Sequence, residues 1–218
     1  MRRIYAEIQD ESAVKLMRKA YEHAYDHGWT DGLPILPATD EDVEVFIAAT
    51  GRAADEVIGI IPPRKGEATI EAVAVNAIMA GCRPEYMPVI VAAIEGLLDP
   101  GFPLEPMQVS TNAMTPFLLI NGPVRHAIDI NSGIGCLGPG WRANATIGRA
   151  IRLVLTNVGG ALPGVYSKST FASPLRYSYI CGENEEENPW TPFHVDRGFG
   201  REDSTVTVFR AANFCNIS

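Results

Sequence analysis

The residues best suited to chemistry lie in a glycine-rich loop around Cys136. An apolar repeat with the period of a helix follows the loop and ends at Gly159 and Gly160. The N-terminus of such a helix carries a partial positive charge and free N–H groups, which together bind anions. A thiol near a helix N-terminus and an arginine tends to be reactive. The predicted centre of the site is therefore this loop, with glycines at Gly133, Gly135, Gly138 and Gly140.

A small anion is the predicted ligand of the loop. Arg142 would close the site with a fork of donors, and Asn144 and Thr146 would cap free N–H groups at the start of the helix. The alternative is a tightly packed turn that binds nothing. The predicted substrate-binding residues are Gly138, Gly140, Arg142, Asn144, Thr146 and Arg125.

Side chains that could move protons lie on either side of the loop in the sequence. Cys136 would be a nucleophile or a redox thiol, and histidines or glutamates would serve as general acids and bases. The glutamates belong to an acidic run, residues 183–187. A solvated surface loop is the alternative interpretation of that run. The predicted catalytic residues are Cys136, His126, His194, Glu183 and Glu185.

The sequence assigns neither a cofactor nor a metal. The loop glycines spell G-x-G-x-x-G, but Pro139 and Gly140 separate the motif from the helix and no acidic residue lies about 20 positions downstream. His23 and His27 have the spacing of a helical metal pair without an HExxH motif. We expect His27 to complement the dipole of its helix instead.

Composition excludes several classes of protein. The chain has 218 residues and a formal net charge of −8, which argues against broad nucleic-acid binding. It contains no run of 18 apolar residues, so no membrane partner is expected. Its four cysteines are widely spaced and form no CxxC pair, which favours a reduced, cytoplasmic protein.

The coarse pattern of elements predicts an α/β fold, with an α+β arrangement as the alternative. Residues 1–100 would form a mainly helical part, packed on an α/β part, residues 101–218, that holds a mixed sheet and the glycine-rich loop. Thr39 with Asp42 resembles a capping box. The expected helices cover residues 12–27, 39–49, 69–79 and 84–98, and the expected strands cover residues 57–61, 107–111, 116–120, 177–181 and 204–209.

Five stretches of the chain carry a family resemblance: TDGLPILPAT, GIIPPRKGEATIEAVAVNAIMAGCRPEYMPV, INGPVR, INSGIGCLGPGWRANATIGRAIRLVLTNVGG and ENEEENPWTPFHVDRGF. Together they resemble a bacterial family of proteins that carry a UGSC or CGSC (seleno)cysteine motif. The motif itself is absent here, which puts in doubt the redox role that the resemblance implies. The resemblance also implies that family members continue beyond the ending NFCNIS.

We expect an enzyme that acts on a small anionic, carboxylate-bearing substrate by cysteine-dependent nucleophilic or redox chemistry. Two alternatives stay open: the N-terminal subunit of a larger, self-processed hydrolase-type enzyme, and a non-catalytic binding or assembly protein. The last expected strand carries Val206, Val208 and Phe209 close to the end of the chain, which suits a sheet that continues elsewhere. A homo-oligomer or a second chain following Ser218 is therefore expected.

Overall fold

The computed structural model describes residues 12–215. Within these residues the chain forms five longer helices, three short helices and two 3-10 turns. The longer helices are α1 (Ala13–Asp26), α2 (Asp40–Ala48), α3 (Ile70–Ala80), α4 (Met87–Leu98) and α7 (Arg142–Asn157). The short helices are α5 (Leu104–Gln108), α6 (Val124–Ala127) and α8 (Phe193–Asp196), and the 3-10 turns are η1 (Pro84–Tyr86) and η2 (Pro174–Arg176).

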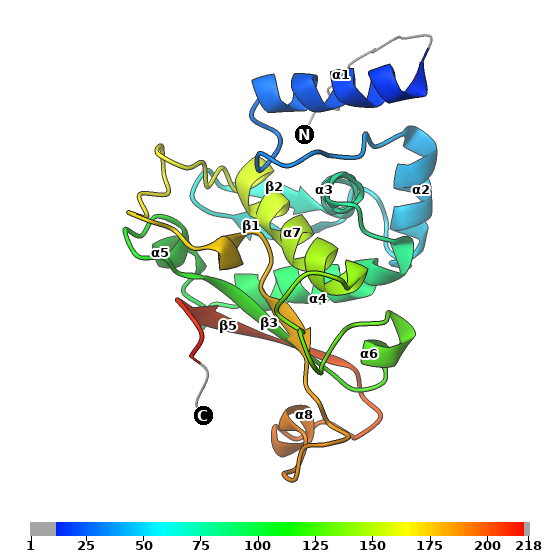
Figure 1. Cartoon of the computed structure of the whole chain (residues 1–218), viewed down its shortest axis with the longest axis vertical. Coiled ribbons are helices and arrows are strands. Elements are labelled where there is room, and N and C mark those ends of the chain that lie inside the picture. The colour runs from blue at the N-terminus through cyan, green and yellow to red at the C-terminus, as the bar shows by residue number, and fades with distance from the viewer. Residues whose placement is uncertain (1–11, 216–218) are drawn as a thin grey trace.

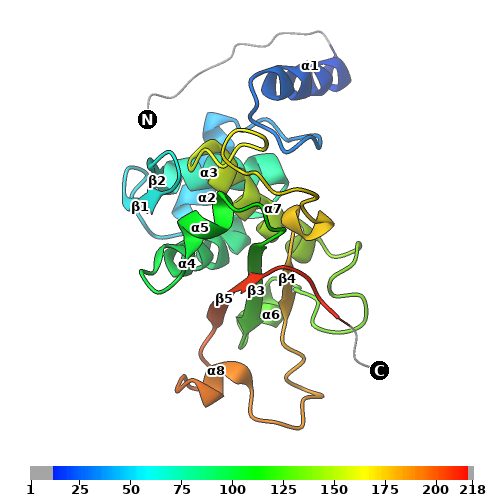
Figure 2. The same ribbon diagram turned by 90° about the vertical axis from the view of Figure 1, so that its left-hand side faces the viewer.

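The strands form two separate sheets. Strands β1 (Val57–Ile61) and β2 (Gly66–Thr69) pair as an antiparallel hairpin. A mixed sheet has the order β4-β3-β5, with β3 (Thr115–Asn121) parallel to β4 (Ile180–Gly182) and antiparallel to β5 (Thr205–Ala211). Figure 2 shows these three strands side by side. Helices and a mixed sheet confirm the α/β prediction.

The core lies between the helices and the mixed sheet. Helix α7 packs along α3, and α4 packs against both α7 and β5 (Figure 1). The buried apolar side chains form one cluster with members on both sides of residue 100. Fully burying a side chain such as Ile90, Leu118 or Leu153 contributes about 1.5–3 kcal/mol.

Helix α7 follows the predicted periodicity. The side chains of Ile147, Ile151 and Val154 are buried on one face. The helix stops where expected, because Gly160 adopts a left-handed φ of 73° that a side chain would disfavour.

The predicted N-terminal caps of this helix are wrong. Trp141 occupies the N-cap position and provides no side-chain hydrogen bond. Asn144 lies inside the helix and is buried, and the Thr146 hydroxyl donates to the Arg142 carbonyl oxygen at 2.8 Å. Both side chains therefore leave the first N–H groups of α7 uncapped.

Two strand predictions also need correction. Residues 107–111 do not form a strand, because Leu104 and Met107, spaced for a helix, are both buried as α5 packs on the core. The strand predicted over residues 177–181 is shorter, and its pairing with β3 begins at Ile180. Strand β2 was not predicted, since its sequence, GEAT, lacks an apolar run.

Two segments project at opposite ends of the long axis of the molecule. Helix α1 lies at one end, and the segment that contains α8 projects beyond the mixed sheet at the other (Figures 1 and 2). None of the helices in residues 12–215 has both the length and the apolar character needed to span a bilayer.

Candidate functional site

Cys136 and Cys181 lie against each other at the centre of the candidate site. Cys136 is half-buried in the glycine-rich loop, residues 130–141, and Cys181 is half-buried on β4. A hydrogen bond joins the two side chains. Burial, and to a smaller extent the neighbouring Cys136 thiol, together raise the pKa of Cys181 to about 12. Both thiols are free.

Asn144 fixes the loop to β4. Its side-chain amide donates to the carbonyl oxygens of Cys136, at 3.1 Å, and Ile180, at 3.4 Å. The same side chain forms a reciprocal pair of hydrogen bonds with the backbone of Asn131, at 2.8 and 3.0 Å. Because Ile180 precedes Cys181, one buried amide positions both cysteines.

A cavity of about 380 Å³ opens beside Cys136. This volume lies within the range of small-molecule sites. Loop, helix and β4 residues line it together: Leu33, Ala80, Cys136, Leu137, Gly138, Asn144, Ala145, Thr146, Arg149, Pro174, Tyr177, Ser178 and Ile180. The predicted residues Gly138, Asn144 and Thr146 therefore share one cavity with the thiol.

The arginines near this cavity already have partners. Arg149 forms a bidentate ion pair with Asp31, with both distances 2.9 Å. The Arg142 guanidinium donates to the carbonyl oxygens of Gly81, at 2.9 Å, and Cys82, at 3.2 Å. Arg142 thus ties the start of α7 to the end of α3. Gly140, also predicted to bind the anion, is exposed with a φ of 132° and open space around it.

The predicted acid–base residues form a different cluster. The Glu183 carboxylate accepts hydrogen bonds from the Asn121 side chain and the Phe193 backbone, at 2.5 and 2.8 Å. Glu185 accepts from the Gly122 N–H at 2.8 Å and pairs with Arg125 at 3.1 Å. Among residues 12–215, no hydrogen bond or ion pair links these carboxylates to Cys136.

Arg125 is the centre of that cluster rather than a substrate-binding residue of the loop. It is 3% exposed and donates to the Glu186 carboxylate at 2.9 and 3.1 Å. His126 contacts the same carboxylate at 3.0 Å. His194 is buried, with its Nδ1 atom 3.9 Å from Glu185, beyond hydrogen-bonding distance. The cluster ties the projecting segment to β3 and α6.

No metal site is evident in the described part of the chain, where no three His, Cys, Asp or Glu side chains gather as ligands would. The ring centroids of His23 and His27 lie 4.1 Å apart with the rings tilted by 36°, and the His27 ring also lies beside Trp29. His27 caps α1, and its Nδ1 atom lies 2.8 Å from the His23 carbonyl oxygen. This position agrees with the expected role at the end of the helix.

Sequence reasoning missed Cys181 as the neighbour of Cys136, and Asp31 as the partner of Arg149 at the cavity. Both reach the site through long-range contacts, and neither lies in a recognisable motif. The ion pair of Asp31 with Arg149 depends on the packing of α7 against the segment before α2. Comparison with protein-family models, with curated proteins and with solved structures gave no match.

Proposed function

We propose that the protein is a thiol-dependent enzyme that acts on a small, carboxylate-bearing molecule through Cys136. The observation that carries this proposal is the pair of Cys136 and Cys181 beside a ligand-sized cavity. Of the two kinds of chemistry expected from the sequence, redox exchange suits this pair better. A hydrolytic mechanism also needs an acid–base group beside Cys136 to protonate the leaving group. The predicted groups lie in the separate cluster instead: Glu183 bonds to Asn121, Glu185 pairs with Arg125, and His126 contacts Glu186.

The proposed reaction is thiol–disulfide exchange. The Cys136 thiolate attacks one sulfur of a substrate disulfide, forms a mixed disulfide and releases the first substrate thiolate, which takes up a proton. Cys181 then loses its proton and attacks the Cys136 sulfur. The protein disulfide forms and the second substrate thiol leaves. Two protein thiols are thereby oxidised while one substrate disulfide is reduced. Two equivalents of a small-molecule thiol then reduce the protein disulfide and leave as their own disulfide.

The substrate carboxylate would bind at the uncapped N-terminus of α7. No side chain caps this end, and Gly138 lies beside both Cys136 and the cavity. Helix N–H groups attract a carboxylate even though Arg142 and Asn144 have other partners. A cytoplasmic setting, where thiols stay reduced, suits the same chemistry.

The test uses 5,5′-dithiobis(2-nitrobenzoate), an aromatic disulfide with two carboxylates, and protein with Cys215→Ser to remove an exposed thiol. We expect rapid release of two equivalents of the coloured thiol and an intact mass lower by two hydrogens. Cys181→Ser should stop after one equivalent, with the mixed disulfide trapped on Cys136. Cys136→Ser should abolish the fast phase.

Cys82→Ser is the matched control. Burial raises the pKa of Cys82 to about 12. The Cys82→Ser variant should therefore still release two equivalents of the coloured thiol. Release of one equivalent without an internal disulfide would overturn the role of Cys181. Labelling of another cysteine before Cys136 would overturn the proposal as a whole.

A further inference from the structure

The last turn of α1 carries two histidines whose rings lie against each other. The ring centroids of His23 and His27 are 4.1 Å apart, and the Trp29 ring lies 5.5 Å from the first and 4.9 Å from the second. His23 is half-buried and His27 is exposed, so the pair reaches solvent at the end of the molecule that α1 occupies (Figure 1). Side chains four residues apart share one face of a helix, which is the spacing that lets two imidazoles bind one ion.

A backbone contact fixes the tautomer of His27. Its Nδ1 atom lies 2.8 Å from the His23 carbonyl oxygen. A carbonyl oxygen only accepts, so Nδ1 carries the proton, and the neutral ring keeps a lone pair on Nε2. Histidines that bind metals in proteins usually donate the other ring N–H in this way, to a backbone carbonyl, a carboxylate or water. His27 thus has the hydrogen bond of a metal ligand, with Nε2 available.

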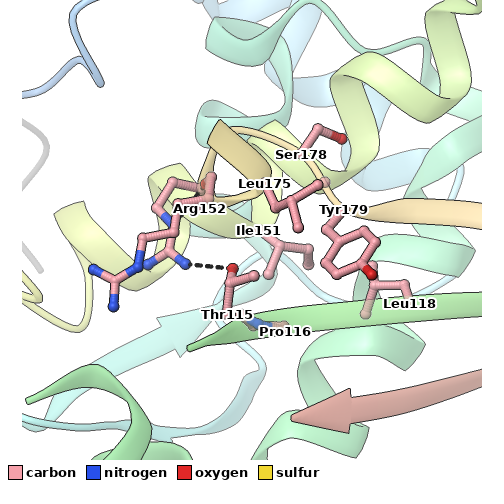
Figure 3. A pocket seen from close by; sticks show the side chains of 10 residues that line it. Thr115, Pro116, Leu118, Ile151, Arg152, Leu175, Ser178 and Tyr179 are labelled. Carbon is pink, nitrogen blue, oxygen red and sulfur yellow. Dashed lines mark hydrogen bonds between the residues drawn. The ribbon is translucent and has the colours of Figure 1, made fainter. Parts of the chain in front are cut away.

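The remaining ring nitrogens have no hydrogen-bond partner in the described part of the chain. This holds for both nitrogens of His23 and for Nε2 of His27. The arginines of α7 are different, since each of them donates to an acceptor. Arg152 Nη2, for example, donates to the Thr115 hydroxyl at 3.1 Å, beside a cavity that holds no more than about one water (Figure 3). The histidine pair is therefore open to a ligand from solvent.

The spacing of the rings fits a shared ion. An imidazole nitrogen lies about 2.0–2.1 Å from a bound Zn²⁺, so two nitrogens on one ion are at most about 4.2 Å apart. Ring centroids 4.1 Å apart and tilted by 36° need only small side-chain rotations to bring one nitrogen of each ring to that separation. A cation at this place also lies at the C-terminal end of α1, where the helix dipole carries partial negative charge. Geometry and electrostatics both favour a bound cation.

We propose that His23 and His27 bind one divalent transition-metal ion of the class that prefers imidazole, such as Ni²⁺, Cu²⁺ or Zn²⁺. His27 contributes Nε2, His23 contributes one ring nitrogen, and water completes the coordination. With two protein ligands the site is more open than a structural zinc site, which has four. Mg²⁺ and Ca²⁺ prefer oxygen ligands and do not bind. The pair shares no residue with the lining of the thiol cavity, so this proposal stands apart from the proposed function.

The other histidines offer a matched control. The chain has four histidines in all. His194 is buried, whereas His126 is exposed and contacts the Glu186 carboxylate at 3.0 Å. His126 has no second histidine four residues away on a helix. Its replacement therefore removes an exposed imidazole without touching the proposed site.

Trp29 gives the site a fluorescent reporter. Its side chain is half-buried against the core, and its carbonyl oxygen accepts from the Asn157 side chain of α7 at 2.9 Å. The indole therefore stays beside the histidines. An open-shell ion such as Ni²⁺ quenches the fluorescence of an adjacent indole, whereas Zn²⁺ has a filled d shell and does not. The other tryptophans, Trp141 and Trp190, lie in the glycine-rich loop and in the projecting segment.

The experiment titrates Ni²⁺ into the full chain at pH 7 and follows tryptophan fluorescence and, by calorimetry, the heat of binding. We expect one equivalent to bind, with saturating quenching that EDTA reverses, that Zn²⁺ prevents by competition and that Mg²⁺ does not affect. Losing an outer-shell partner already costs about 10–100-fold in metal affinity, so His23→Gln and His27→Gln should each weaken binding by at least about tenfold. His126→Gln should bind as the wild type does, and Trp29→Phe should keep the heat of binding but lose the quenching.

Three results would contradict a shared ion. Equal binding by His23→Gln and the wild type places the ion elsewhere and overturns the proposal. Loss of binding in only one of the two histidine variants identifies a single-histidine contact. Competition by Mg²⁺ overturns the metal class. If a variant disturbs α1, wild-type crystals grown with Ni²⁺ decide the question: an anomalous peak should lie about 2.1 Å from one nitrogen of each ring, and its absence there overturns the proposal.

Discussion

Asn144 explains why the candidate site depends on packing rather than on the loop alone. A glycine-rich loop has many accessible conformations, and ordering it costs free energy. The buried amide offsets part of this cost by bonding to Asn131 and Cys136 on the loop and to Ile180 of β4. The residue predicted to bind an anion thus acts on the thiols indirectly.

Replacing Asn144 tests this role. Asn144→Ala leaves the Asn131 N–H and nearby carbonyl oxygens without their buried partner. We expect the free energy of unfolding, measured with urea, to fall by about 2–4 kcal/mol. The second equivalent of coloured thiol should also be released more slowly, because the thiols are less well aligned.

Asn112→Ala is a suitable control, since the Asn112 side chain is exposed. It should change stability by less than about 0.5 kcal/mol. A small loss of stability in Asn144→Ala, with fast disulfide formation retained, would mean that β4 and the loop hold their positions without the amide.

At the level of elements, the projecting segment that contains α8 is attached through charge. Arg125 contacts both Glu185 and Glu186, and it is held at the end of β3 by the Gly122 carbonyl oxygen. The hydrogen bond from Arg125 lowers the pKa of Glu186 to about 2, and His126 adds to the effect. The attachment should therefore be sensitive to acid.

The stability contributed by Glu186 should decrease as the pH falls. A carboxylate with a lowered pKa in the folded state stabilises the protein above its ordinary value of 4.5, and this stability is lost as pH falls towards about 2. Because Glu186 is 54% exposed, screening limits its contribution to about 0.5–1 kcal/mol. We expect Glu186→Gln to be less stable than the wild type by this amount at pH 6.

Urea unfolding from pH 6 to pH 2 provides the measurement. The difference between wild type and Glu186→Gln should close as pH falls through this window. Glu187→Gln, at an exposed neighbour, serves as the control and should show a smaller difference at pH 6. A stability difference between wild type and Glu186→Gln that stays constant with pH would argue against an ionic contact between Glu186 and Arg125.

Local patterns predicted the elements well where neighbouring residues decide the structure. Periodicity located α7, and Thr39 caps α2 by accepting from the Asp42 N–H at 3.1 Å. The pattern failed at residues 107–111, because a short apolar run does not distinguish a strand from a buried helical turn. The site was predictable only in part: Cys136 could be found from its loop, whereas its contact with Cys181 depends on tertiary packing.

At the level of the whole molecule, the mixed sheet has two edges without a described partner. Strands β4 and β5 each pair with β3 on one side only, within residues 12–215. Ile134, Phe171 and Trp190 are also highly exposed. Edge strands and exposed apolar side chains suit association, so the predicted oligomer or second chain stays a prediction that sedimentation of the purified chain can test.

The hydrophobic core does not follow the predicted division of the chain into residues 1–100 and 101–218. Helix α4 precedes this point and α7 follows it, yet both contribute to one apolar cluster. Side chains from the two parts are therefore expected to unfold together. Separate domains would each keep a core of their own and would share few buried contacts.

Two truncations, one in each part, test this expectation by calorimetry. Ile90→Ala on α4 and Leu153→Ala on α7 each remove a fully buried side chain, at a cost of about 2–5 kcal/mol. We expect a single transition in both variants, with Tm lowered by roughly 5–15 °C. Val45→Ala, at an exposed position of α2, should move Tm little. Two separate transitions, each shifted by only one variant, would instead establish two domains, because a shared core cannot lose half of its contacts and leave the other half at its original stability.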